Sequence, residues 1–322
     1  MKTIDVTALG ELLIDFTDSG TSAQGNMLLE ANPGGAPCNV LSMLTKLGRK
    51  TAFIGKVGND MFGRLLKQET EDAGIDMQGL LLDESARTTL AFVHKKPNGD
   101  RDFSFYRNPG ADMMLRRDEV REDLIENARI FHFGSLSMTH EGVREATKKA
   151  VLYARDSGCI VSFDPNLREP LWKDLNDARE QIAWGLSHCD VLKISDNEIV
   201  WFTGEEDYDA GIAYLTERYH IPLILLSKGP EGSSAYQNGR RVDAAPFLQE
   251  NTVETTGAGD TFCACVLSYV LDHGFRDLSD LQMEEMLRFA NAAASIVTTR
   301  KGALRVMPGR EEVTALIESR TN

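Results

Sequence analysis

Short apolar runs rich in β-branched residues alternate along the chain with longer segments in which apolar residues recur every three or four positions. The short runs predict strands and the longer segments predict helices. The predicted strands are Ile4–Leu9, Ala52–Gly55, Ile130–Gly134, Ile160–Asp164, Val191–Ser195 and Leu223–Ser227. The predicted helices include Pro37–Leu47, Phe62–Ala73, Val143–Ser157, Ala178–Leu186, Asp207–Arg218, Ala258–His273 and Met283–Thr299. This alternation favours an α/β fold with a mostly parallel sheet covered by helices on both faces.

Two segments, residues 12–33 and 87–112, interrupt this alternation with shorter, strand-like patterns. In the second segment Pro97–Asp100 predicts a tight turn, after which Phe103 and Phe105 return on one face of a hairpin. Antiparallel strands inserted into a parallel body must lie outside the main sheet. We therefore expect a single domain over residues 1–322, with these two segments forming a small β lid. The lid should lie over the C-terminal edge of the sheet, where α/β proteins bind ligands.

The segment Thr255–Phe262 places two glycines and an alanine directly before an apolar helical pattern. The glycines should lie at a helix N-terminus, where unpaired N–H groups and the helix dipole favour an anion. Asp260 would repel that anion, but it can accept the proton of a hydroxyl that attacks it, as phosphoryl transfer to an alcohol requires. The alternative is a glycine-rich loop whose aspartate only stabilises the positive helix end. The predicted catalytic group is Asp260 with the backbone N–H groups of Gly257, Ala258 and Gly259.

Four motifs in this order connect the chain to one family. Gly34–Asn39 lies near the start and Gly257–Asp260 near the end, and this pair resembles the ribokinase (PfkB-type) carbohydrate kinases. Between them, Phe105–Met113 and Asp164–Trp172 resemble the fructokinase branch of that family. The resemblance covers the chain from about residue 5 to residue 308. It implies a ribokinase-like body in three α/β/α layers with a β lid, which in many relatives also forms a homodimer contact.

The resemblance also implies an activity, the phosphorylation of D-fructose by Mg·ATP to give fructose 6-phosphate. Two alternatives stay open at this point. One is the same chemistry on another acceptor, such as 2-keto-3-deoxygluconate, ribose or a nucleoside. The other is a catalytically silent sugar-binding protein on the same fold, against which the intact Asp260 argues.

Four residues are expected to bind the sugar from the N-terminal part of the chain. Asp15 is a carboxylate in an apolar run and needs a partner, which sugar hydroxyls or a salt bridge in the lid would supply. Gly34 and Gly35 let the backbone approach the sugar. Asn39, on the first turn of the next helix, offers a donor and an acceptor, although it would also serve as a helix cap.

Two arginines are the cationic candidates at the site. Arg107 ends the lid hairpin, and Arg168 follows the strand that ends at Asp164. Either could bind a sugar oxygen or stabilise the transferred phosphate, and surface ion pairing is the alternative for both. A keto acid substrate would need one of them for its carboxylate, which keeps 2-keto-3-deoxygluconate open as a substrate.

The resemblance implies a nucleotide site in the C-terminal half. Relatives carry an asparagine and a glutamate that order Mg²⁺ through water, and this chain keeps Glu198 but has Ser195 in place of the asparagine. Asn291 falls where relatives contact adenine, although a polar residue on a wet helix face is the alternative. The expected nucleotide-binding residues are Lys193, Glu198, Ser227, Lys228, Gly229, Gly232 and Asn291.

A K⁺ site is also implied, because residues 300–303 resemble the monovalent-cation loop of ribokinases. Relatives often have an aspartate six residues before the catalytic one, and this chain has the longer glutamate there. K⁺ activation therefore stays an open expectation. The residues concerned are Glu254, Thr256, Arg300 and Gly302.

Composition restricts the partners. The 322 residues include 35 basic and 49 acidic ones, a formal net charge of −14, which argues against nucleic acid or an anionic membrane as partner. No apolar run reaches membrane-spanning length, and the N-terminus lacks a signal-peptide pattern. Five cysteines without CxxC spacing favour reduced thiols in the cytoplasm, and the six histidines show no zinc-ligand spacing. The expected partners are thus a small sugar and ATP.

Overall fold

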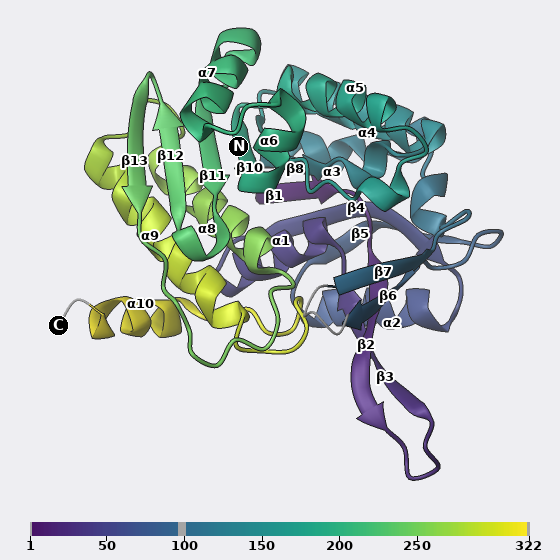
Figure 1. The fold of residues 1–322 in the computed structure, drawn as a ribbon. Helices are drawn as coiled ribbons and strands as arrows, with labels where there is room; N and C mark the ends of the chain where they lie inside the picture. Colours follow the sequence, from purple (N-terminus) through teal and green to yellow (C-terminus); the bar gives the residue numbers. More distant parts are fainter. Residues whose placement is uncertain (1, 96–100, 321–322) are drawn as a thin grey trace.

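The computed structural model describes residues 2–95 and 101–320. A nine-stranded sheet forms its centre, and the strands pair in parallel except for two at one edge (Figure 1). All six predicted strands are present in this sheet, which confirms the α/β class. In spatial order the strands are β13 (Arg240–Ala244), β12 (Ser233–Gln237), β11 (Leu223–Ser227), β10 (Val191–Ser195), β9 (Ile160–Asp164), β8 (Ala128–Gly134), β1 (Ile4–Leu9), β4 (Thr51–Gly58) and β5 (Asp76–Asp83).

The two antiparallel edge strands, β12 and β13, were not predicted from the sequence. Asn238 and Gly239 connect them, and both have a positive φ, of 51° and 73°. An Asn-Gly pair with positive φ at both positions is the preferred two-residue connection of a β-hairpin. The dipeptide was therefore a usable signal, although the flanking strands are too short and polar to stand out by hydrophobic pattern.

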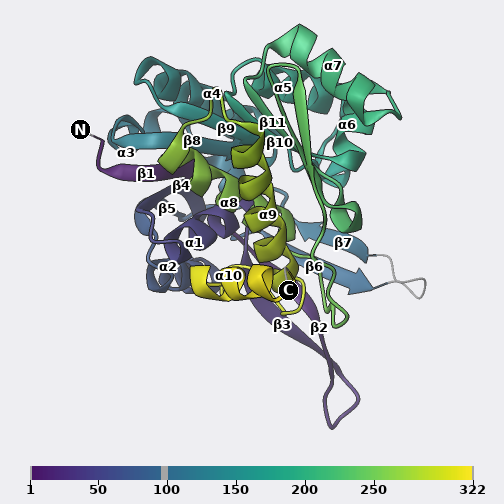
Figure 2. The ribbon, with the colours of Figure 1, turned by 90° about the vertical axis from the view of Figure 1, so that its left-hand side faces the viewer.

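Helices cover both faces of the sheet, so the body has the three expected layers (Figures 1 and 2). Two separate cores lie on the two faces of the sheet, and a single strand can contribute to both. On β1, Val6 and Ala8 pack into the core on one face and Leu9 packs into the other. The first face carries α1 (Ala36–Lys46), α2 (Met61–Asp72), α8 (Ala258–His273), α9 (Asp280–Val297) and α10 (Arg310–Ser319). The second carries α3 (Glu122–Glu126), α4 (Glu141–Asp156), α5 (Leu175–Leu186), α6 (Asp196–Thr203) and α7 (Tyr208–Tyr219).

Helix α8 is the central helix of its layer and lies between α1 and α9. Its apolar side chains are buried on nearly every side, because the helix packs on the sheet as well as on both neighbours. Burial of this kind fixes the position of its N-terminus. Short 3₁₀ turns occur at Ala111–Met114, Arg117–Glu119, Leu136–Met138, Glu169–Leu171 and Gly229–Glu231.

A second sheet of four strands lies outside the main sheet, which confirms that expectation (Figure 1). The predicted turn at Pro97–Asp100 lies outside the described residues. Strands β2 and β6 pair in parallel, and each forms an antiparallel hairpin with its other neighbour. The strand order is β3 (Met27–Gly34), β2 (Leu13–Thr21), β6 (Leu90–Lys95) and β7 (Arg101–Tyr106). Within the described part of the chain, no helix combines the length and apolar character that crossing a membrane requires.

Candidate active site

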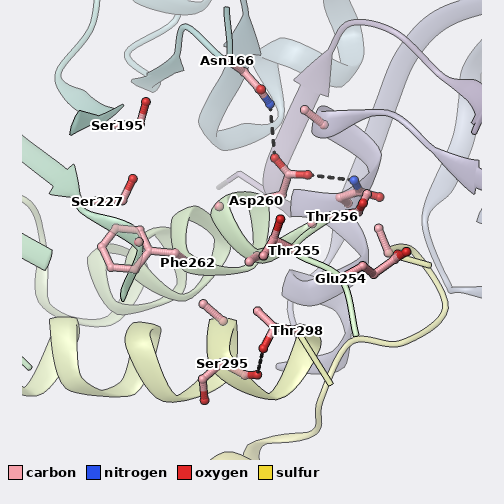
Figure 3. A pocket seen from close by; sticks show the side chains of 18 of the residues that line it. Asn166, Ser195, Ser227, Glu254, Thr255, Thr256, Asp260, Phe262, Ser295 and Thr298 are labelled. Carbon is pink, nitrogen blue, oxygen red and sulfur yellow. Dashed lines mark hydrogen bonds between the residues drawn. The ribbon is translucent and has the colours of Figure 1, made fainter. Parts of the chain in front are cut away.

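A cavity of about 920 Å³ lies between the small sheet, the N-terminus of α8 and the C-terminal ends of the parallel strands (Figure 3). Ser195 and Ser227 reach it from the ends of β10 and β11, and Asp15 reaches it from β2. The carboxyl ends of parallel strands form one edge of the sheet, where α/β proteins bind ligands. This cavity therefore gathers residues from most of the chain.

The residue directly before α8 has to be a glycine. Gly257 precedes the helix with a φ of 78°, and a Cβ added there would lie 2.8 Å from the Cβ of Ala303. Both the left-handed conformation and the close approach exclude a side chain. The backbone of Gly257, Ala258 and Gly259 lines the cavity, as predicted. The first N–H groups of a helix have no partner within it, so this turn is suited to hold an anion.

Asp260 lies on the first turn of α8 and is buried, with 7 % of its surface exposed. Its Oδ2 accepts a hydrogen bond from Nδ2 of Asn39 at 2.7 Å, and its Oδ1 accepts a longer one from Nδ2 of Asn166 at 3.4 Å (Figure 3). Burial raises the pKa of Asp260, although the bond from Asn39 and the charges of Lys193 and Arg168 oppose the rise. The carboxylate is thus oriented by neutral amides and is basic enough to accept a proton.

Asp15 occupies the small-sheet side of the cavity. Burial raises the pKa of Asp15 to about 7; nearby Arg168 lowers it, while Glu254 and Asp260 raise it further. A Cβ on Gly34 would lie only 2.5 Å from Oδ2 of Asp15, so this glycine leaves the space that the carboxylate occupies. Gly34 itself does not line the cavity.

The start of α1 adds a second buried carboxylate, which the sequence analysis missed. Gly35 has a φ of 124°, and a Cβ there would lie 2.5 Å from the backbone oxygen of Glu11. Oε1 of Glu11 accepts the N–H of Ala36 at 2.8 Å, so Glu11 caps the helix that carries Asn39. Burial raises the pKa of Glu11 to about 7. The argument applied to Asp15, a carboxylate within an apolar run, would also have found Glu11.

Arg107 does not reach the cavity, and the expectation that it contacts the sugar is not supported by its position. Its guanidinium is buried and donates to Asp112 at 2.7 Å, to Oγ1 of Thr139 at 2.8 Å and to the carbonyl of Leu136 at 3.1 Å. Through these bonds Arg107 joins the end of β7 to the 3₁₀ turns at Ala111–Met114 and Leu136–Met138. A sequence pattern could not reveal this, because Thr139 and Leu136 come from a distant segment.

Arg168 is the arginine that the structure brings to the site. It is exposed, lines the cavity and donates one hydrogen bond, from Nη1 to the carbonyl of Leu167 at 3.1 Å. Its charge lowers the pKa values of both Asp15 and Asp260. A cation that acts on both carboxylates and lines the cavity can pair with an anionic group of a ligand.

A buried ion pair lies beneath the glycine turn. Nζ of Lys193 is 3.1 Å from Oδ2 of Asp164, and it would be 3.4 Å from a Cβ on Gly259. Burial raises the pKa of Asp164 to about 7, with Lys193 opposing the rise. Oδ1 of Asp164 also accepts the N–H of Asn166, at 3.2 Å. Asp164 and Asn166 belong to a motif that we quoted for the resemblance, but their roles at the site were not predicted.

Glu198 uses both carboxylate oxygens within the protein. Oε1 accepts the N–H of Leu167 at 2.7 Å, and Oε2 accepts the N–H and the hydroxyl of Ser195, both at 2.8 Å. Burial opposes ionisation, but Lys193 and these hydrogen bonds lower its pKa overall. Within the described residues, no cluster of three or more His, Cys, Asp or Glu could hold a metal ion.

The loop after β11 is placed partly as expected. Ser227, Gly229 and Gly232 line the cavity, whereas Lys228 does not, and its Nζ lies 3.4 Å from Oδ1 of Asp243. Asn291 on α9 lines the cavity and is buried, so it does not lie on a wet helix face.

The expected cation loop is also partly assembled. Oε1 of Glu254 accepts the N–H of Gly302 at 2.8 Å, which joins the segment before α8 to residues 300–302. Thr256 and Gly302 line the cavity. The side chain of Arg300 points elsewhere, because it donates to the carbonyl of Val306 and pairs with Glu312.

A buried carboxylate beside a glycine turn at a helix N-terminus is the arrangement that phosphoryl transfer to an alcohol requires, and comparison with known proteins specifies the family. Residues 3–309 match the model of the pfkB family carbohydrate kinases, and the chain belongs to this family. The protein is therefore a kinase. It is 39 % identical to probable fructokinase-4 from Arabidopsis thaliana over 315 residues, which are 97 % of this chain and 96 % of that protein.

Solved structures agree with this assignment. The crystal structure of a fructokinase from Xylella fastidiosa with bound ATP matches with a TM-score of 0.91 at 30 % identity and covers both chains completely. A fructokinase from Vibrio cholerae O395, in a form with fructose, ADP and calcium ion bound, matches with a TM-score of 0.88 at 27 % identity. That match covers 98 % of this chain and 100 % of the other.

Proposed function

We propose that this protein transfers the γ-phosphoryl group of ATP to the 6-hydroxyl of D-fructose, giving fructose 6-phosphate and ADP. The observation that carries the proposal is the position of Asp260, a buried carboxylate on the first turn of α8, beside the glycine turn at Gly257–Gly259 that lines the same cavity. A base and an anion cradle on one helix turn are the two parts that phosphoryl transfer to an alcohol requires. The relationship to fructokinases along the whole chain supports fructose as the acceptor.

In this proposal Asp260 takes the proton of the sugar hydroxyl while its oxygen bonds to the γ-phosphorus. The bond from that phosphorus to the β–γ bridging oxygen breaks in line, and ADP leaves with the electron pair. The N–H groups of Gly257–Gly259 and the ammonium of Lys193 stabilise the negative charge on the transferred group. Mg²⁺ bound to ATP would neutralise phosphate charge, and Glu198 would hold it through water.

The sugar is held on the other side of Asp260. The carboxylate of Asp15 can accept hydrogen bonds from two sugar hydroxyls, and the side-chain carbonyl Oδ1 of Asn39 is buried without a hydrogen-bond partner. A buried acceptor without a partner is costly, so a sugar hydroxyl would stabilise it. Arg168 can donate to a further sugar oxygen or to the transferred phosphate.

A substrate panel with Mg·ATP tests the proposal. We expect kcat/KM for fructose to exceed the values for ribose and for 2-keto-3-deoxygluconate by roughly 100-fold, since unmet hydrogen bonds in a polar site are costly. A panel in which the keto acid is preferred would overturn fructose as the acceptor. A panel without any phosphorylated product would overturn the kinase mechanism built on Asp260.

The donor set before α8 is suited to K⁺ as an activator. Glu254 is a buried carboxylate that contacts the N–H of Gly302, and the backbone carbonyls of residues 300–302 lie in the same loop. Oxygen ligands of this kind suit hard cations. We propose that Glu254, Thr256 and the carbonyls of Arg300 and Gly302 would hold the ion, whose charge would stabilise the turn before Asp260.

The small sheet supports two further proposals. It forms a lid that closes on the sugar, since Asp15, Val93 and Phe105 line the cavity from this sheet. It also forms a homodimer contact, because β3 exposes 64 % of Met27 and 44 % of Leu28. Sedimentation of the wild type and of Met27→Lys would test the dimer.

All five cysteines are buried and unpaired, which suits a reducing compartment such as the cytoplasm.

A further inference from the structure

The helix that carries Asn39 begins without a cap of its own. Its N-cap residue is Gly35, which has no side chain, and the first turn of α1 contains no acidic residue. Pro37 in that turn has no N–H. A glycine is needed at the cap, because its φ is 124° and an added Cβ would lie 2.5 Å from the backbone oxygen of Glu11. The usual Ser, Thr or Asp cap is therefore excluded, and a cap must come from another segment.

Glu11 supplies this cap from the segment that leads into β2. Its Oε1 accepts the N–H of Ala36 at 2.8 Å, and only 4 % of the residue is exposed. A carboxylate at a helix N-terminus also interacts favourably with the helix dipole. Because a buried carboxylate is costly unless hydrogen bonds hold it, Glu11 and the N–H of Ala36 fix each other in place.

The capped turn also holds the residue that orients the proposed base. The N–H of Asn39 donates to the carbonyl of Gly35 at 3.0 Å, so the backbone of Asn39 belongs to this turn. Asn39 is 3 % exposed, and its Nδ2 donates to Oδ2 of Asp260 at 2.7 Å. Its Oδ1, buried without a partner, is left for the sugar. A shift of the turn would therefore disturb the base and the sugar contact together.

We propose that Glu11 is a positioning residue for phosphoryl transfer, which holds Asn39 where its carboxamide both orients Asp260 and meets the sugar. The inference rests on the proposed function, in which Asp260 is the base. The effect of Glu11 passes through the first turn of α1 and not through contact with the reacting atoms. A displacement of about 1 Å at a reacting group can cost roughly 100-fold in rate, so loss of this cap should lower kcat as well as stability.

Three substitutions at Glu11 test the role of the cap. Glu11→Ala removes it, and we expect kcat to fall by roughly 10–100-fold while KM for ATP changes by less than about twofold. Glu11→Gln keeps a side-chain oxygen for the N–H of Ala36 and should recover most of the lost kcat. Glu11→Asp keeps the charge but is shorter by one methylene, so it should lose kcat as Glu11→Ala does, and it replaces Glu11→Ala in the comparison if that variant does not fold. Recovery with Asp but not with Gln would overturn the proposal.

A double-mutant cycle with Asn39 separates this role from a general loss of stability. If Glu11 acts through Asn39, Glu11→Ala should lower kcat by less than about threefold when Asn39→Ala is already present. An equal loss of kcat in both backgrounds would overturn the proposal. The matched control is Asp207→Ala, which removes the side chain that caps α7 through the N–H of Ala210 at 2.9 Å on the other face of the sheet. This control should lower Tm without changing kcat.

The same measurements separate failure of the inference from failure of the proposed function. A wild-type protein that does not phosphorylate fructose would remove the proposed function. An active wild type in which Glu11→Ala keeps its kcat, or in which the cycle is additive, would remove only the role of Glu11.

Discussion

Nδ2 of Asn39 donates a 2.7 Å hydrogen bond to Oδ2 of Asp260 and thereby joins the first turns of α1 and α8, 221 residues apart in sequence. Both helix ends border the same cavity, one carrying the sugar-side glycines and the other the phosphate turn. The bond fixes the orientation of the proposed base before any ligand binds. Preorganisation of this kind is a large part of catalysis in phosphoryl transfer.

Replacing the base should affect the chemical step more than binding. We expect Asp260→Asn to lower kcat by a factor on the order of 10²–10⁴, the usual range for loss of a general base. The affinity for ATP should change little, because the phosphate turn is backbone. Steady-state kinetics and ATP titration measure the two effects, with Asp272→Asn at the other end of α8 as the control. An Asp260→Asn variant with half of the wild-type kcat would show that Asp260 is not the base.

Asp15 should make the protein less stable as the pH rises. Burial raises the pKa of the Asp15 carboxyl from 3.8, its ordinary value, to about 7 in the folded protein. At pH values between 3.8 and about 7, the folded protein therefore holds a proton on Asp15 that the unfolded chain has lost. Its contribution to stability is therefore lost as the pH rises from about 4 to about 7. Asp15→Asn should raise Tm over wild type by a few degrees at pH 8, and by less at pH 5.

The matched control for this pH effect is Asp18→Asn, which removes an exposed carboxylate from the same strand. Thermal melts of the three proteins at pH 5 and pH 8 give the comparison. An Asp15→Asn difference that is the same at both pH values would refute the link to titration of Asp15.

The two arginines should behave in opposite ways. Arg107→Ala leaves Asp112 buried without its cation, so we expect a loss of about 3–5 kcal/mol in the free energy of unfolding. Arg168→Ala should change that free energy by less than about 0.5 kcal/mol, since the side chain is exposed, while raising KM for fructose or lowering kcat. Urea unfolding and kinetics on both variants test this. If Arg107→Ala and Arg168→Ala had the same free energy of unfolding, the structural role assigned to Arg107 would be wrong.

K⁺ should raise kcat if Glu254 and the loop at residues 300–302 hold the ion. The expected increase comes from ordering of the turn at Gly257–Gly259, and Glu254→Gln should abolish it. Initial rates in KCl are compared with rates in tetramethylammonium chloride at equal ionic strength. Identical rates in the two salts would mean that this chain has no K⁺ effect.

Fructose should close the lid over the cavity and exclude water, which would otherwise hydrolyse ATP. Amides of residues 87–95 and 101–112 should become protected from hydrogen exchange when fructose and a non-hydrolysable ATP analogue bind together. Asp15→Ala should reduce this protection, raise KM for fructose and lower kcat. If saturating ligands leave exchange unchanged, the small sheet is a fixed structure and its exposed residues on β3 serve only assembly.

Much of this protein was determined by the sequence itself, wherever the physical cause is local. The buried strand Ile160–Asp164 and the helix that begins at Ala258 follow from the spacing of apolar residues. The turn before that helix needs a residue with a positive φ, and the sequence supplies Gly257 there. The separate small sheet was predictable because two segments interrupt the alternation of strands and helices with short strand-like patterns, although β12 and β13 show that antiparallel strands can also join the edge of the main sheet. The sequence pointed to Asp15 as a candidate site residue because it is a charge within an apolar run. It pointed to Asp260 because this carboxylate directly follows a glycine turn.

Only the tertiary structure decided which groups meet. Arg107 and Arg168 look alike in sequence, but packing buries the first against Asp112 and leaves the second at the cavity. Asn291 was expected to contact the base, yet β12 and the end of β13 supply partners for its amide. The reason is physical: periodicity and backbone conformation depend on neighbours in sequence, whereas hydrogen-bond partners of buried polar groups come from distant segments.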